Sequence, residues 1–150
     1  MKKFILLAAV AVTFSLSAMA ATSDPIGNEK VEKTFNELFK GAQNVQWYNS
    51  GKYIMAHFVT GDVRTRVRLD EEGKLLQTIR YYGESELPTH IVASLKENFS
   101  GKNVWGITEV SNEKGIVYHI VLKDAKHWYN VISNADGEMN LSKKFKRGDK

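Results

Sequence analysis

The strongest constraint on how this chain folds is an internal similarity between two of its segments. A helical pattern runs from about Asn28 to Lys40, with its apolar residues on one face, and a second helical pattern begins near Pro88. A fixed offset between similar segments indicates a tandem duplication. The matched pairs, each sixty positions apart, are Val31 and Ile91, Phe35 and Leu95, Phe39 and Phe99, and Gly41 and Gly101.

The residues after each helical pattern favour short strands joined by tight turns, because the turns are rich in Gly, Asn and Asp. The expected strands span residues 44–48, 52–60, 62–69, 74–82, 103–110, 115–122, 126–133 and 138–145. Strands joined by tight turns are antiparallel. We therefore predict an α+β fold, a tandem repeat of one helix plus about four antiparallel strands, with the two helices packed on one face of an antiparallel sheet. The other face is expected to meet solvent or a partner.

The first twenty residues have the order of a secretory signal peptide. Lys2 and Lys3 precede an apolar run over residues 4–12, and small residues follow as far as Ala20. The run is shorter than the roughly 20 apolar residues that cross a bilayer. We expect cleavage after Ala20 and a periplasmic or secreted protein. Residues 21–150 are then a single domain made of two repeats, at about 28–82 and 88–146.

Charge and composition argue against several classes of partner and chemistry. Residues 1–20 hold two lysines and no acidic residue, so the formal net charge falls from +4 to +2 without them. That charge is too small for phosphate-driven binding of nucleic acid. The chain has no cysteine, and it lacks the motifs of nucleophile elbows, zinc-protease helices and phosphate-binding loops. The four histidines lack metal-ligand spacing. We therefore expect no enzyme, no metal and no cofactor.

Alternation along the strands predicts which side chains lie on the face away from the helices. In residues 62–69, three arginines alternate with apolar residues and a threonine, so the arginines are expected to point outward. One half of this open face is predicted to be cationic and the other aromatic, which favours an acidic partner. Solvated arginines and an ordinarily packed tryptophan are the alternative interpretation. The candidate partner-binding residues are Tyr53, Met55, His57, Arg64, Arg66, Arg68, Arg80, Tyr82, His119 and Trp128.

Three kinds of structural motif occur along the expected domain: a short amphipathic helix, aromatic residues in the strands that follow it, and glycines in turns. They comprise Ala42-x-Asn44-Val45-x-Trp47, then Tyr53 and Phe58, then Asp70-x-x-Gly73-Lys74, and a helix start at Leu87-Pro88. In this combination the chain resembles exported PepSY-like or β-lactamase-inhibitor-like proteins. The resemblance implies a tandem αβ-repeat domain without catalytic residues. In the inhibitors of that family, the open sheet face holds another protein.

The expected function is therefore that of an exported, non-catalytic binding module of unknown partner, protein-binding or inhibitor-like through the open sheet face. Two alternatives remain open, a carrier of an apolar or anionic small ligand in the cupped sheet and a structural component of an envelope assembly. The expected partner is a protein or peptide of acidic character, with no nucleic acid and no membrane span. A homodimer formed through the sheet face is a further option.

Overall fold

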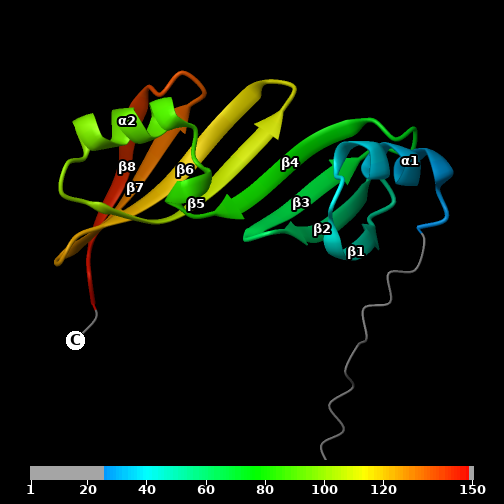
Figure 1. The fold of residues 1–150 in the computed structure, drawn as a ribbon, viewed down its shortest axis with the longest axis horizontal. Coiled ribbons are helices and arrows are strands. Elements are labelled where there is room, and N and C mark those ends of the chain that lie inside the picture. Colours follow the sequence, from blue (N-terminus) through cyan, green and yellow to red (C-terminus); the bar gives the residue numbers. More distant parts are fainter. Residues whose placement is uncertain (1–25, 149–150) are drawn as a thin grey trace, which may run out of the picture.

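The computed structural model describes residues 26–148, and its main feature is one eight-stranded sheet (Figure 1). Every neighbouring pair of strands is antiparallel, and the strand order in the sheet follows the order in the chain. The strands are β1 (Gln43–Asn49), β2 (Ile54–Thr60), β3 (Val63–Leu69), β4 (Leu75–Tyr82), β5 (Asn103–Asn112), β6 (Gly115–Lys123), β7 (His127–Asn134) and β8 (Met139–Lys146). The helices are α1 (Glu29–Leu38), the 3-10 turn η1 (Glu84–Glu86) and α2 (Thr89–Asn98).

This architecture corrects the predicted fold class. The α+β prediction of a tandem helix-plus-strand repeat with two helices packed on the sheet is wrong, because the fold is mainly β. Each α-helix has only ten residues. The eight strands form a single sheet that crosses the boundary between the expected repeats, since β4 pairs with β5. That pairing satisfies backbone groups that would otherwise lie on two unpaired strand edges. The apolar periodicity of the helical segments did not indicate how much of the core the strands supply.

The buried side chains form two clusters, one in each half of the sheet. Helix α1 contributes Val31 and Phe35 to the first cluster, where the Phe35 and Phe58 rings meet edge to face with centroids 5.2 Å apart. Helix α2 contributes Ile91 and Leu95 to the second cluster, whose other members come mainly from β5, β6 and β7. The strands therefore supply most of the buried apolar surface.

The turn between β3 and β4 is hydrogen-bonded to, and closely packed against, the start of α1. The side chain of Asn28 caps the helix by accepting hydrogen bonds from the backbone N–H groups of Lys30 and Val31, at 3.1 and 3.2 Å. Its Nδ2 donates to the Glu71 carbonyl at 2.9 Å. Gly73, in the same turn, has a φ of +84°, and a Cβ built on it would lie 2.7 Å from the Lys30 carbonyl oxygen. A side chain at this position would separate the turn from the helix.

The predicted signal peptide, residues 1–20, lies outside the described residues. Within residues 26–148, no helix has the length and apolar character needed to cross a membrane.

Candidate functional site

The face of the sheet opposite the two core clusters carries the predicted arginines. In β3, buried and exposed residues alternate strictly, so Val63, Val67 and Leu69 face the core. Arg64 and Arg66 therefore lie on the opposite, open face. The candidate residues of β2 and β3 are brought together there, because Met55 is paired with Arg68 and His57 with Arg66. Tyr53 lies beside them, under the guanidinium of Arg68.

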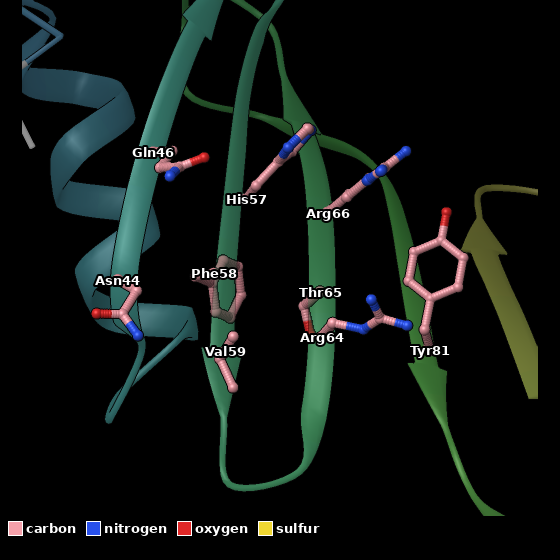
Figure 2. A pocket seen from close by; sticks show the side chains of 9 residues that line it. All are labelled: Asn44, Gln46, His57, Phe58, Val59, Arg64, Thr65, Arg66 and Tyr81. Atoms are coloured by element: carbon pink, nitrogen blue, oxygen red, sulfur yellow. The ribbon is translucent and has the colours of Figure 1, made fainter. Parts of the chain in front are cut away.

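A groove of about 420 Å³ runs across β1 to β4 on this open face (Figure 2). Figure 2 shows the side chains of His57 and Arg66 next to each other, with Tyr81 standing beside the arginines. Strand pairing explains this arrangement, because Gln46 is paired with His57 and Arg64 with Tyr81. The remaining lining residues are Asn44, Phe58, Val59 and Thr65.

The arginines of this groove contact aromatic rings rather than carboxylates. The guanidinium carbons of Arg64 and Arg66 lie 5.9 and 5.5 Å from the centroid of the Tyr81 ring. Arg68, outside the groove, lies 4.9 Å from the centroid of Tyr53, and both residues line a separate pocket. In residues 26–148, Arg80 forms an ion pair with Glu109, and His127 lies 3.7 Å from Asp124, a contact that is an ion pair only when the imidazole is protonated. Neither contact includes a groove arginine. The groove therefore presents positive charge that no neighbouring carboxylate neutralises.

His57 supplies neutral hydrogen-bonding capacity beside this charge. Burial lowers the pKa of His57 below its ordinary 6.5, and the positive charge of Arg66 lowers it further. Its ring lies 4.6 Å from the ring of Tyr48, whose hydroxyl donates to Gln46 Oε1 at 2.9 Å. At neutral pH the imidazole is uncharged, so it offers one donor and one acceptor to a bound group.

Two of the predicted site residues lie on the other face of the sheet. Arg80 is paired with Thr65, a core-facing residue, and Tyr82 is only 7% exposed. The cause is a β-bulge, because the pairing of β3 with β4 shifts by one residue between Arg68 and Leu69. A one-residue shift reverses the face of every residue beyond it. It places Tyr81 instead of Arg80 beside Arg64, so the assignment of Arg80 and Tyr82 to the open face is wrong.

Arg80 and Tyr82 belong to a polar cluster on the core side of β4 and β5. The Tyr82 hydroxyl donates to Glu109, and Arg80 Nη1 lies 3.3 and 3.2 Å from the two carboxylate oxygens of that residue. Glu109 is only 8% exposed. Burial, together with the hydrogen bond to Glu109, raises the pKa of Tyr82 far above its ordinary value. This cluster satisfies a buried carboxylate between the two apolar clusters and is not part of the groove.

The remaining predicted residues, His119 and Trp128, lie in the second half of the sheet, away from the groove. His119 is exposed, and its pairing with Thr108 and Ile132 places it on the open face. Trp128, on β7, meets Trp105 edge to face with centroids 5.4 Å apart. Trp105 is 61% exposed. The predicted set is therefore dispersed. The groove contains His57, Arg64 and Arg66, a separate pocket contains Tyr53 and Arg68, the core-side cluster contains Arg80 and Tyr82, and Trp128 belongs to an aromatic cluster.

Sequence reasoning missed Tyr81 and Gln46 in the groove and Trp105 in the aromatic cluster. Trp105 lies where the pairing of β5 with β6 shifts between Val104 and Gly106, so alternation could not assign its face. Trp47 faces the core, and Gln46 precedes it in the strand. Alternation from an apolar Trp47 to a polar Gln46 could therefore have placed Gln46 on the open face. Within the described residues, no group of three or more His, Cys, Asp or Glu side chains could hold a metal ion.

Comparisons with known proteins find relatives only at the level of structure. No protein-family model matches the chain, and no curated protein sequence matches it. A BLIP-like protein from Bacteroides fragilis has a TM-score of 0.58 at 17% identity, over 80% of this chain and 87% of its own. A DUF2874 family protein from Bacteroides ovatus has a TM-score of 0.58 at 19% identity, over 83% of this chain and 89% of its own.

A third similar structure is a Bacteroides eggerthii protein provisionally described as periplasmic, with a TM-score of 0.55 at 17% identity over 79% of this chain and 87% of its own. Likeness at such low identity concerns the fold alone. It supports the β-lactamase-inhibitor-like part of the sequence resemblance, and nothing in the comparisons supports the PepSY-like part. The chain therefore shares its fold with BLIP-like and DUF2874 proteins.

Proposed function

We propose that this protein is an exported, non-catalytic, inhibitor-like binding protein that holds an acidic segment of a protein partner in the groove over β1 to β4. The observation that carries the proposal is the pair Arg64 and Arg66, which flank the Tyr81 ring in a groove of about 420 Å³ without a carboxylate partner. Arginine and tyrosine are among the residue types that dominate binding energy at protein interfaces. The BLIP-like structural neighbour is consistent with this class of function.

The chemistry of the groove favours a carboxylate-bearing segment. An aspartate or glutamate side chain can accept two parallel hydrogen bonds from one guanidinium, which is the strong form of this interaction. Neutral His57 and Gln46, in the row next to Arg66, can pair with the backbone of the same segment. Tyr81 gives the segment an apolar wall. Both charge and hydrogen bonding are thus available within one row of the sheet.

The direct test is a pull-down from the envelope and secreted fractions of the producing cell. The bait is the wild-type protein, compared with Arg64→Ala/Arg66→Ala and with the control Lys33→Ala/Lys40→Ala, which removes the same charge at exposed positions in and just after α1. We expect one protein to be captured by the wild type and the control but lost by the arginine variant. Equal capture by all three baits would contradict the assignment of the groove.

A second candidate function is the carriage of a small anionic ligand in the same groove. Its volume falls in the range of about 300 to 1,000 Å³ that is typical of small-molecule sites. In this case, small carboxylates or phosphates raise the melting temperature of the wild type but not of Arg64→Ala/Arg66→Ala, and the pull-down recovers no protein. The two experiments together separate the two candidates.

We also propose that residues 1–20 direct export and that residues 21–150 form the working domain. The sequence order of charges and apolar residues supports this proposal. It is tested by the mass of the protein recovered from the exported fraction. A recovered chain that still begins at Met1 would contradict it.

A further inference from the structure

The end of the sheet opposite to the β5–β6 turn gathers basic and aromatic side chains from three separate segments. It consists of the start of β5, the turn from β6 to β7 and the end of β8, and we call it the sheet tip. Pairing brings the segments together, because Asn103 is paired with Lys123, Lys123 with Trp128, and Trp128 with Phe145. Figure 1 shows the β6–β7 turn and the end of β8 at the same end of the sheet.

The aromatic side chains of the sheet tip are unusually open to solvent. Trp105 is 61% exposed and Phe145 is 47% exposed, and both are among the large apolar residues that the fold leaves uncovered. Trp128, half-buried, joins them through its edge-to-face contact with Trp105 and its pairing with Phe145. Core packing does not explain these three rings, since none of them belongs to either core cluster.

Basic side chains lie beside the aromatic residues on both faces of the sheet tip, next to Trp105 on one face and next to Tyr129 on the other. The Lys123 ammonium lies 3.8 Å from the centroid of Trp105, on the open face. On the core side, the Lys102 and Lys144 ammonium groups lie 5.0 and 5.3 Å from the centroid of Tyr129. No lysine takes part in an ion pair in the described part of the chain. The basic residues of the sheet tip are Lys102, Lys123, Lys126, Lys144, Lys146 and Arg147.

Two acidic residues lie near these cations: Glu84 lines a pocket together with Lys102, and Asp124 is occupied by its own turn. It accepts hydrogen bonds from the Tyr129 hydroxyl at 2.5 Å and from the backbone N–H groups of Lys126 and His127, both at 2.7 Å. The bond from Tyr129 is the largest cause that holds the pKa of Asp124 well below its usual range. The carboxylate therefore stays ionised to hold the turn together, and the sheet tip keeps a large excess of positive charge.

We propose that the sheet tip binds end-on to a bilayer surface that contains anionic lipids. Tryptophan and phenylalanine are favoured at the boundary between headgroups and acyl chains, and lysine and arginine are attracted to anionic headgroups. The distribution of the charges favours a lipid surface over a peptide. Cations lie on both faces of the sheet end, with Lys123 on one and Lys144 on the other, so a flat surface that meets the whole end can contact all of them. A peptide in a groove would contact one face.

The test is co-sedimentation with vesicles of phosphatidylcholine, prepared with or without phosphatidylglycerol. The protein is taken as the cell exports it, and the same N-terminus is verified by mass spectrometry in every variant. Wild type is expected to sediment with the anionic vesicles only. Lys144→Gln/Lys146→Gln is expected to lose roughly 25-fold in affinity, about fivefold for each lysine. The matched control Lys33→Gln/Lys40→Gln removes the same charge in and just after α1 and is expected to bind as wild type does.

Tryptophan fluorescence adds a readout that charge alone would not move. Insertion of Trp105 into the headgroup region shifts its emission to the blue, and Trp105→Ser should remove most of the shift, leaving the part from the half-buried Trp128, while the circular dichroism spectrum stays unchanged. Equal losses of vesicle affinity in Lys144→Gln/Lys146→Gln and in its control would overturn the proposal. It would also be overturned if the protein sedimented without a fluorescence shift and bound soluble heparin equally tightly, because the tip would then be a general polyanion site. The groove variant Arg64→Ala/Arg66→Ala should sediment normally, so this proposal stands or fails independently of the proposed function.

Discussion

The contact of the β3–β4 turn with helix α1 leads to a quantitative prediction for two glycines. Gly73 and Gly51 have nearly the same positive φ, +84° and +80°. They differ in their surroundings. A Cβ on Gly73 would lie 2.7 Å from the Lys30 carbonyl oxygen and 3.0 Å from Thr34 Oγ1, whereas a Cβ on Gly51 would meet nothing within 4 Å. Alanine at the two positions therefore separates backbone strain from a steric clash.

The magnitudes follow from these contacts. A side chain in the left-handed region costs about 1 to 2 kcal/mol, and this cost applies to both variants. The stabilising effect of alanine on the unfolded chain, about 0.4 to 1 kcal/mol, also applies to both. The clash at Gly73 involves a backbone carbonyl in the first turn of the helix, which cannot rotate away as a flexible side chain can, and overpacking of this kind costs about 1 to 3 kcal/mol. Gly73→Ala is thus expected to be less stable than Gly51→Ala by about 1 to 3 kcal/mol.

Equilibrium unfolding in urea measures this difference directly, provided that the slope with denaturant is the same in both variants. A midpoint for Gly73→Ala that is clearly lower than that for Gly51→Ala is the expected result. The usual size of a surface effect is about 0.5 kcal/mol. If the two free energies of unfolding agree within that range, close packing of Gly73 against the Lys30 carbonyl does not stabilise the start of α1.

Three further predictions concern the polar cluster, the groove and the N-terminus. Tyr82→Phe removes a hydrogen bond to the Glu109 carboxylate and should lower the free energy of unfolding by about 1.5 to 3 kcal/mol at neutral pH. Because the folded state raises the pKa of Tyr82 above its ordinary 10.0, its stabilising contribution is complete below pH 10 and declines progressively as the pH rises from there towards the folded-state pKa. Urea titrations across the alkaline range should therefore show a smaller loss of stability in Tyr82→Phe. His57 should titrate below 6.5 by NMR, and Arg66→Ala should raise the midpoint only in part, since burial is the larger cause of the shift. Mass spectrometry of the exported protein should give a chain that begins at Ala21.

Alternation predicted the faces of β2 and β3 because one face of these strands is buried and the other is not. The expected strand at residues 62–69 corresponds to β3 (Val63–Leu69), and the orientation of Arg64, Arg66 and Arg68 followed from its strict pattern. In such a strand the side-chain period fixes the face of every residue once one residue is assigned. The cationic character of the groove was therefore accessible from the sequence.

The parts that the sequence did not predict lie beyond β-bulges and in the overall balance of helix and strand. The shift between Arg68 and Leu69 exchanged Tyr81 for Arg80 in the groove, and the shift between Val104 and Gly106 concealed the role of Trp105. A bulge adds one residue to one strand, and no local pattern here marks its position. The fold class failed for a different reason. The internal similarity suggested two helix-plus-strand units, but nothing in the local patterns showed that β4 pairs with β5 and joins all eight strands into one sheet.

The agreement between strand order and chain order has a consequence for how the molecule forms. Every strand pairs only with its predecessor and its successor in the sequence, and of these pairings that of β4 with β5 has to wait for an intervening segment, η1 and α2. The other six pairings are hairpins, and closing their short loops costs little chain entropy. A chain that emerges from a pore with its N-terminus first can add each strand to the growing edge as it appears. Throughout its emergence, the open edges of this sheet are β1 and the newest strand.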